Sequence, residues 1–201
     1  MIQEWEKILN LIKSMTVDND FKLIESNGTR LFGHVKMIGE NAWFHEVFAP
    51  LDVKEITEIE LELKIQIPKS LKSFFQCSNG IILFSDELAI FGKRKSFKRT
   101  GDDVRLPYSI INPNTFERPS DAKNNYLFIG SYSYDGSKIF IDTQTEIINV
   151  CERWKSLNVV CQWNNIWDFL LQEMNRLQTF FNDNMMLKDN KRCTLPPNRF
   201  E

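Results

Sequence analysis

The sequence predicts an α+β fold in which an antiparallel sheet of about five to six strands packs against helices. Three observations carry this prediction. Apolar residues recur at intervals of three and four in three separate segments, which is the period of a helix. Short apolar runs bounded by turn residues such as Asn27-Gly28 and Asp135-Gly136 indicate strands joined in hairpins. No internal repeat or low-complexity tract divides the 201 residues.

Composition favours a folded protein in solution. The chain is 42% hydrophobic and 26% charged, a balance that supports a packed core rather than disorder. No apolar run approaches the roughly 20 residues that a membrane-spanning helix needs. The first fifteen residues lack the small-residue cleavage site of a secretory signal. We therefore expect a cytoplasmic protein that does not enter a membrane.

Residues 1–50 are expected to form an N-terminal elaboration. Apolar residues at helical spacing predict an amphipathic helix over residues 2–15, and residues 21–35 fit two strands joined by the Asn-Gly turn. An aromatic cluster follows, and we expect it to pack on the core, with exposure at an interface as the alternative. The cluster comprises Trp43, Phe44, Val47 and Phe48.

Residues 53–80 predict two consecutive helices. Ile56, Ile59 and Leu63 fall at i, i+3 and i+7 with glutamates on the other faces, which indicates an amphipathic helix with an acidic side. Pro68 suits the first position of a second helix, and Asn79-Gly80 supplies the left-handed residue that ends many helices. This prediction places Cys77 in the second helix, where a small buried residue is expected.

The remaining sheet is predicted in two parts. Residues 81–84 and 88–91 fit adjacent antiparallel strands, and residues 93–125 fit a long excursion with little regular structure. A three-strand meander is expected from residue 126 to residue 151, with Asp135-Gly136 as its first turn.

A closing helix over residues 166–177 is predicted to pack across the sheet, with Asn165 and Asp168 as a capping pair. The main domain is therefore expected over residues 51–181, within one structural unit. Residues 182–201 lose the helical period and are expected to form a loosely held tail.

The sequence shows no motif for catalysis. His34 and His45 are the only histidines, and no nucleophile elbow or glycine-rich phosphate loop is present. The four cysteines have no metal-binding spacing, which favours reduced thiols over disulfides or a zinc site. We expect no catalytic residue, no cofactor and no metal. A deep polar pocket that held a histidine beside an acid would favour an enzyme instead.

Charge is distributed unevenly along the chain. Residues 93–120 carry seven cations against three acids, whereas residues 51–92 carry four cations against seven acids. Such polarity could steer a charged partner, and ordinary solvation is the alternative. The stretch 93–99 combines five cations with one aromatic residue, as single-stranded nucleic-acid sites do. Direct nucleic-acid binding is nevertheless not favoured, because the net charge is −2 and no nucleic-acid motif appears.

Residues 53–80 resemble the opening of the SUKH superfamily. The resemblance rests on the acidic helix, the Ile67-Pro68 step, Leu71 with Phe74-Phe75, and Asn79-Gly80. It continues through residues 88–92, the stretch IGSYSYDGSKIFID and the closing helix, and so covers roughly residues 50 to 180. Two features depart from the minimal domain of this superfamily: the basic segment, residues 93–120, and the long segment before residue 50.

The resemblance implies a non-catalytic protein that binds another protein. The superfamily includes bacterial immunity proteins that neutralise polymorphic toxins and fungal regulators of cell-wall synthesis. We therefore expect a cognate toxin as partner, with a regulatory or scaffold module as the alternative. The acidic residues between 52 and 62 would suit a basic nuclease toxin. The sequence predicts no oligomeric state.

Two segments supply the candidate partner-binding residues. The basic segment contributes charges, and the predicted hairpin contributes aromatic groups beside polar ones, a composition enriched at interfaces. Packing within the sheet is the alternative for the two tyrosines, which have the same parity and could share one face. The candidates are Arg94, Lys95, Lys98, Arg99, Tyr132, Tyr134 and Asp135.

Overall fold

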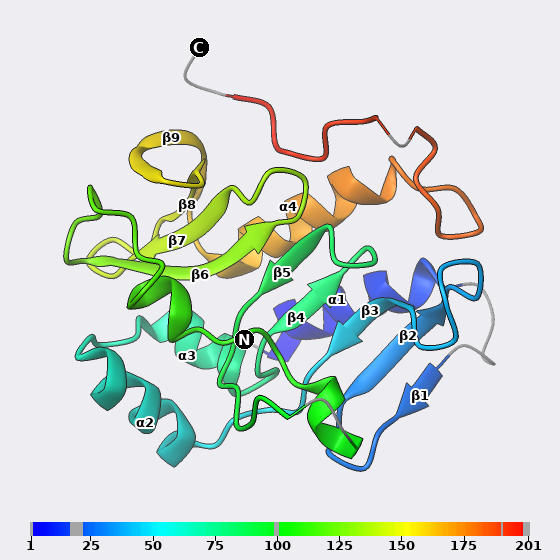
Figure 1. Ribbon diagram of the computed structural model, residues 1–201, viewed down its shortest axis with the longest axis horizontal. Coiled ribbons are helices and arrows are strands. Elements are labelled where there is room, and N and C mark those ends of the chain that lie inside the picture. The colour runs from blue at the N-terminus through cyan, green and yellow to red at the C-terminus, as the bar shows by residue number, and fades with distance from the viewer. Residues whose placement is uncertain (1, 17–21, 99–100, 190, 199–201) are drawn as a thin grey trace.

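A computed structural model of the chain describes residues 2–16, 22–98, 101–189 and 191–198. Nine strands among these residues form one antiparallel sheet, in which each strand pairs with the next along the chain (Figure 1). The α+β class with an antiparallel sheet is thus confirmed, but the expected five to six strands were too few. The helices are α1 (Ile2–Ser14), α2 (Val53–Leu63), α3 (Lys69–Phe75) and α4 (Ile166–Gln178), with short 3-10 helices η2 (Gly101–Arg105) and η3 (Asn112–Asn114); the strands are β1 (Lys22–Ile24), β2 (Arg30–His34), β3 (Trp43–Val47), β4 (Ile81–Leu83), β5 (Leu88–Ile90), β6 (Tyr126–Tyr132), β7 (Lys138–Asp142), β8 (Ile148–Glu152) and β9 (Lys155–Trp163).

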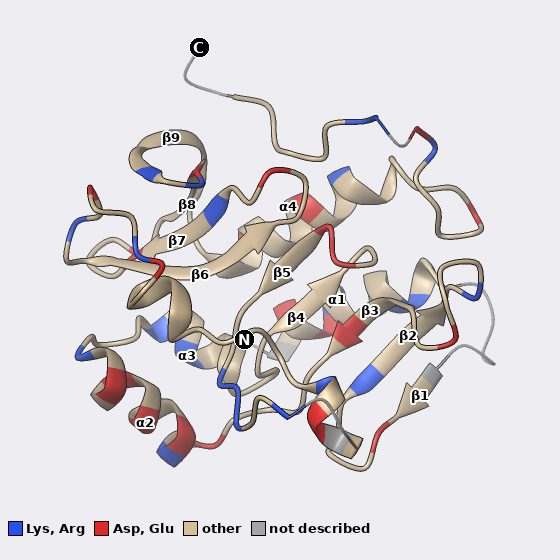
Figure 2. Ribbon diagram, viewed as in Figure 1, with Lys and Arg blue, Asp and Glu red and all other residues tan. Residues whose placement is uncertain are grey.

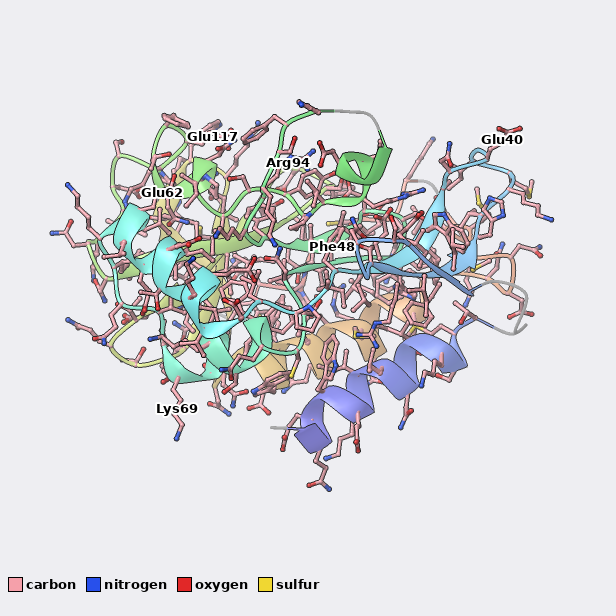
Figure 3. All side chains as sticks on the ribbon, turned by 90° about the horizontal axis from the view of Figure 1, so that it is seen from below. Glu40, Phe48, Glu62, Lys69, Arg94 and Glu117 are labelled. Atoms are coloured by element: carbon pink, nitrogen blue, oxygen red, sulfur yellow. The ribbon has the colours of Figure 1, made fainter. Side chains whose placement is uncertain are left out.

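The two faces of the sheet are covered differently. Figure 3 shows α1 and α4 on one side of the sheet and the excursion after β5 on the other. The helical side holds the main core, a cluster that includes Ile12 of α1, Leu170 of α4 and Ile139 of β7, all with no exposed surface. The excursion side holds a smaller aromatic cluster built on Phe128 and Phe140. The excursion therefore packs against this face of the sheet and is not a free loop.

The helix ends explain why the helices form where the sequence predicts them. Asp52 accepts a hydrogen bond from the Glu55 amide at 2.7 Å, and the Glu55 side chain accepts one from the Asp52 amide at 3.1 Å, which completes a capping box for α2. Asn165 caps α4 in a similar way through the amides of Trp167 and Asp168. Each cap satisfies amides that have no partner within the helix.

The second central helix is shorter than predicted. It starts after Pro68 as expected, but it ends at Phe75. Gly80 does adopt the left-handed conformation, with φ +89°, yet it joins the chain to β4 instead of ending the helix. Cys77 consequently lies in the turn after α3 and is only half-buried, contrary to the expectation of a buried helical residue.

Two strands were not predicted. β3 contains the aromatic cluster, whose Phe44, Val47 and neighbouring Phe48 are buried, so the expected core packing is confirmed. The strand alternation is hidden there because Phe44 and His45 are buried on opposite faces. β9 was missed for the opposite reason, since most of this edge strand is polar or exposed.

The segment after Phe181 is anchored more firmly than its sequence predicts. Thr194 has no exposed surface, and its hydroxyl donates to the Glu87 carboxylate at 2.8 Å. Arg176 of α4 donates to the backbone oxygens of Thr194 and Leu195 at 2.6 and 3.2 Å. These contacts correct the expectation of a loosely held tail for its described part. Partly buried Met185, Met186, Leu187 and Leu195 of this segment also pack on the main core, but their spacing has no helical or strand period that would mark them in the sequence.

Candidate functional site

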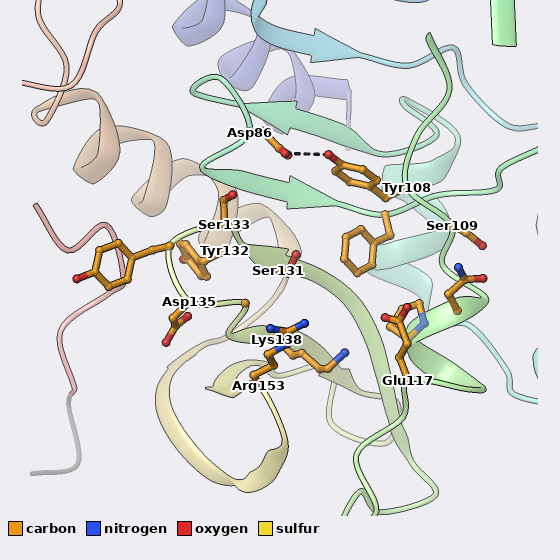
Figure 4. Close-up of a pocket in the computed structure, with 15 residues that line it drawn as sticks. Asp86, Tyr108, Ser109, Glu117, Ser131, Tyr132, Ser133, Asp135, Lys138 and Arg153 are labelled. Atoms are coloured by element: carbon orange, nitrogen blue, oxygen red, sulfur yellow. Dashed lines mark hydrogen bonds between the residues drawn. The ribbon is translucent and has the colours of Figure 1, made fainter. Parts of the chain in front are cut away.

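A pocket of about 590 Å³ opens on the excursion side of the sheet, beside the β6–β7 turn (Figure 4). Tyr108, Asn112 and Glu117 of the excursion form one wall. The opposite wall is the β6–β7 hairpin, with Tyr134 and Asp135 at its turn. This volume lies within the range of ordinary ligand sites. The pocket therefore contains the hairpin turn that the sequence singled out, together with wall residues that the sequence did not.

The floor of the pocket is hollow because one row of the sheet carries small side chains. Lys138 of β7 lies directly opposite Ser131 of β6, and Ser131 lies opposite Ala89 of β5. Directly opposite residues in antiparallel strands share a face. Gly130 brings β6 close to β5, since a Cβ atom there would lie 2.3 Å from the Ala89 oxygen. Lys138 is thus the one long side chain in a row of small ones.

Lys138 and Arg153 are cations without a counter-ion. Lys138 is 7% exposed, and its ammonium lies 5.9 Å from the Phe128 ring centre and 5.4 Å from that of Trp154. The Arg153 guanidinium lies 5.1 Å from the same tryptophan ring. Neither forms an ion pair or a side-chain hydrogen bond with another described residue. Burial lowers the Lys138 pKa, the negative charge of Glu117 opposes this shift, and the smaller effect of Arg153 lowers the pKa further.

The turn between β4 and β5 carries Asp86 into the same pocket. Phe84, Ser85 and Asp86 have φ values of 58°, 54° and 78°, a left-handed conformation that residues other than glycine adopt at a cost. The ring of buried His45 accepts a hydrogen bond from the Phe84 amide at 3.3 Å. Tyr108 donates to the Asp86 carboxylate at 2.8 Å, but burial still raises the Asp86 pKa. Strained turns of this kind gather at functional sites.

The two hairpin tyrosines occupy different environments. Tyr132 has no exposed surface, and its hydroxyl donates to Glu173 of α4 at 2.6 Å. The packing alternative therefore holds for Tyr132, and the two tyrosines do not share a face. Tyr134 follows the strand and is 51% exposed, and Asp135 accepts hydrogen bonds from the Ser137 amide and hydroxyl. Tyr134 is the tyrosine of the predicted pair that a partner can reach.

The basic segment pairs with the acidic helix of the same chain. Lys93 forms an ion pair with Glu58, and Lys95 forms one with Glu55 at 2.5 Å. Arg94 points inward and donates to the backbone oxygens of Leu106 and Pro107 at 3.1 and 3.0 Å. Figure 2 shows the acids of α2 beside the cations that follow β5. Two ion pairs therefore join the charged regions that the sequence separates, and each pair removes one exposed charge from both regions.

Two predicted residues of the basic segment remain. Lys98 is exposed, and only its backbone amide is bonded, to the Ser96 hydroxyl at 3.1 Å. Arg99 lies outside the described residues. The structure thus brings Tyr134 and Asp135 together at the pocket, and none of residues 93–98 lines it.

Sequence reasoning missed the pocket residues Asp86, Tyr108, Lys138 and Arg153. A weak signal existed for one of them, because Lys138 directly precedes the apolar run of residues 139–141. The others come from separate turns, and no spacing in the sequence connects them. Neither histidine lines this pocket: His34 bonds to the Glu40 oxygen at 2.8 Å and His45 is buried in the core.

Comparison with known protein families gave a match. A family model described as the SMI1/KNR4 family (SUKH-1) matches residues 50–172, more than half of the chain. The matched region runs from the end of the N-terminal hairpin segment into α4 and includes the hairpin, the excursion and the pocket. No curated protein matches the sequence. Within the described residues, no helix is long and apolar enough to span a membrane.

Proposed function

Since the chain belongs to the SMI1/KNR4 family (SUKH-1), we propose that it is a non-catalytic immunity protein that binds and neutralises a cognate polymorphic toxin. It would act in the cytosol of the cell that carries it. Neutralisation would follow from occlusion, in which the bound protein covers the active site or the substrate surface of the toxin. A nuclease toxin is one candidate partner.

The observation that carries this proposal is the exposed rim of the pocket. Tyr108 and Tyr134 line the pocket and are 44% and 51% exposed, and Trp154, which is 57% exposed, contacts both Lys138 and Arg153. Exposed aromatic side chains beside polar groups are the composition of interaction hot spots. Three exposed aromatic side chains gathered near one pocket form a surface of the kind that a protein partner covers.

The hairpin that presents Tyr134 is held rigidly from behind. Glu173 accepts from Tyr132 and also binds Arg176 at 2.6 Å, and Arg176 in turn holds the C-terminal segment. Burial and the Glu173 carboxylate raise the pKa of Tyr132, so its hydroxyl remains a donor. A preorganised surface loses little conformational entropy when it binds. This arrangement supports a binding role for the hairpin face.

The basic segment supports the proposal less well. Lys93 and Lys95 are already paired with α2, which reduces both the positive field of the segment and the negative field of the helix. Lys95 and Lys98 would therefore contribute to the rate of encounter with a partner rather than to the energy of the complex. The acidic residues between 52 and 62 are weakened in the same way as a site for a basic nuclease.

Protection and binding should be tested together. We would express the chain with candidate toxins encoded next to it, score cell survival, and measure the affinity of each protective pair with purified proteins. Tyr134→Ala should lower the affinity for the toxin about 30-fold, the loss of about 2 kcal/mol that is typical of a hot spot. The double variant Lys95→Glu/Lys98→Glu should change the association rate and leave the dissociation rate nearly unaltered.

The outcomes separate three functions. Survival with one toxin, lost on Tyr134→Ala, supports immunity through the hairpin face. Survival that is lost only on the double charge reversal would move the interface to the basic segment. If no toxin is neutralised and the chain binds housekeeping proteins through Tyr134, the second candidate, a regulatory or scaffold module, is correct.

A further inference from the structure

We propose that the pocket beside the β6–β7 hairpin is a binding site for a carboxylate group, held between Lys138 and Arg153. This inference assigns a ligand chemistry to the pocket and does not depend on a toxin being the partner. Figure 4 shows the ends of both side chains together in the pocket, below Ser131. Both also contact the ring of Trp154, 5.4 and 5.1 Å from its centre.

The first argument is the unpartnered ammonium. The Lys138 residue is 7% exposed, its ammonium still reaches the pocket, and none of its three N–H groups is bonded to another described residue. A charge that has lost most of its surrounding water is less favourable unless a counter-ion or hydrogen bonds compensate it. The contacts with Phe128 and Trp154 satisfy only part of this need, because a cation–π contact is weaker than an ion pair.

The second argument comes from a comparison with two other partly buried cations of the described chain, Arg105 and Arg176. Arg105 binds the Glu46 carboxylate at 2.9 Å, and Arg176 binds the Glu173 carboxylate at 2.6 Å. Both guanidinium groups thus meet a carboxylate supplied by the chain itself. Lys138 and Arg153 lie close enough to repel each other, and neither has a described carboxylate within ion-pair distance, while Glu117 on the excursion wall acts on Lys138 from farther away. The direct contact with a carboxylate that Arg105 and Arg176 make is the contact that these two cations lack.

The third argument selects a carboxylate over phosphate. Three acids line the pocket: Asp86 accepts from Tyr108, Asp135 accepts from Ser137, and Glu117 lies on the excursion wall. Their negative charge opposes a dianion more strongly than a single charge. A planar carboxylate also matches the paired N–H groups of a guanidinium, while the ammonium can bind it from a second direction.

The carboxylate has two possible sources, an aspartate or glutamate side chain of a bound protein and a free small carboxylate. Both share the chemistry that the pocket recognises. A protein source would place its backbone at the mouth between Tyr108 and Tyr134, whereas a small molecule would lie wholly within the cavity of about 590 Å³. The experiment below therefore uses one probe for each source.

The test titrates the full chain with two matched probes, N-acetylglutamate amide and N-acetylglutamine amide, which differ only in charge. Side-chain NMR signals of Lys138 and the fluorescence of Trp154 report binding. We expect saturable binding of the glutamate probe with a dissociation constant on the order of 1 mM, and at least tenfold weaker binding of the glutamine probe. A Trp154→Phe variant identifies the fluorescence change that comes from this ring.

Three variants assign the site. Lys138→Met and Arg153→Gln should each weaken the glutamate probe tenfold or more. Lys155→Met is the matched control. Lys155 is exposed at the start of β9 and pairs with Glu152 at 3.1 Å, so its replacement should leave binding unchanged. The fold of each variant is checked by circular dichroism, and Arg153 is exposed, so its replacement leaves the core intact.

Two further probes, a peptide and citrate, distinguish the two possible sources of the carboxylate. Stronger binding of a blocked heptapeptide with one central glutamate than of citrate assigns the carboxylate to a protein, and the reverse order assigns it to a small molecule. The proposal is overturned if the folded protein binds neither, if Lys138→Met binds the glutamate probe as well as the wild type, or if inorganic phosphate binds more tightly. None of these results bears on survival with a toxin, which is measured separately.

Discussion

Lys93 and Lys95 of the basic segment each pair with a glutamate of α2, whereas Lys138 and Arg153 of the pocket meet each other without a carboxylate. In the sequence the first group stands out as a cluster and the second does not. In the structure two cations of the cluster are paired with acids of the same chain, whereas Lys138 and Arg153 form no ion pair with a described residue. A run of like charges therefore does not indicate an available surface, because a complementary run elsewhere in the chain can use it.

The largest effect should come from removing the anchor behind the pocket. Glu173→Met leaves the Tyr132 hydroxyl and the Arg176 guanidinium buried without their shared acceptor. We expect the free energy of unfolding to fall by about 3–5 kcal/mol, measured by urea denaturation. Gln172→Met, an exposed neighbour on the same helix, is the control and should change stability little. A loss below about 1 kcal/mol would show that the network does not hold the hairpin.

Acid should weaken the turn between β4 and β5, which carries Asp86 into the pocket. Burial lowers the pKa of His45 from an ordinary 6.5 to about 3, so the folded protein keeps this ring neutral. Below pH 6.5 the unfolded chain takes up a proton that the folded chain does not, and stability falls as the pH falls. This residue should account for a loss of about 3 kcal/mol between pH 6.5 and pH 4.

The measurement compares urea denaturation of the wild type and of His45→Gln across that pH range. The glutamine oxygen can still accept from the Phe84 amide, which keeps the turn in place. The difference between the two curves should be largest at high pH and shrink toward pH 4, because glutamine does not titrate. Parallel curves would show that His45 is not the group that titrates.

Replacing one cation from each region should affect the free energy of unfolding differently. Arg94→Met removes two hydrogen bonds to the backbone oxygens of the excursion and should lower the free energy of unfolding by about 1–2 kcal/mol. Lys138→Met removes a buried charge that lacks a counter-ion and should leave stability unchanged or raise it by up to about 1 kcal/mol. Urea denaturation at pH 7 measures both. A clear loss in Lys138→Met would assign this residue to the fold and not to a ligand.

The smallest effect should come from the surface ion pair between Lys95 and Glu55. A double-mutant cycle on Lys95 and Glu55 should give a coupling energy of about 0.5 kcal/mol, because the lysine side chain is more than half exposed. The coupling should shrink as salt is added. Lys98→Met, with no described side-chain partner, is the control and should not respond to salt in this way. A coupling above about 2 kcal/mol would mean that the basic segment is a structural element in its own right.

The helices and most of the strands could be predicted because their signals are local. The helical period of Ile56 and Ile59, the caps at Asp52 and Asn165, and the Asn27-Gly28 turn all lie within a few residues of the elements they define. β3 and β9 were missed because strand alternation is visible only where one face is buried and the other is exposed. The C-terminal segment was underestimated since its anchor at Thr194 is a hydrogen bond to residue Glu87, far away in the chain.

The candidate site could be predicted only in part. Tyr134 and Asp135 stand beside a recognisable turn, so the sequence located the hairpin tip. It could not tell Tyr134 from Tyr132, because the end of β6 lies between them and decides which ring faces α4. It also gave equal weight to every cation, since pairing depends on distances that no spacing encodes.

By itself the sequence determined the family, the α+β class, the four main helices and the turn that carries Tyr134, because periodicity, caps and turns act between neighbours in the chain. The tertiary structure alone decided which charges are free. Antiparallel pairing set Lys138 in a row of small side chains, the turn after β8 brought Arg153 beside it, and the excursion carried Lys93 and Lys95 away to α2. Electrostatic and packing interactions act through space, so they appear only once distant segments have met.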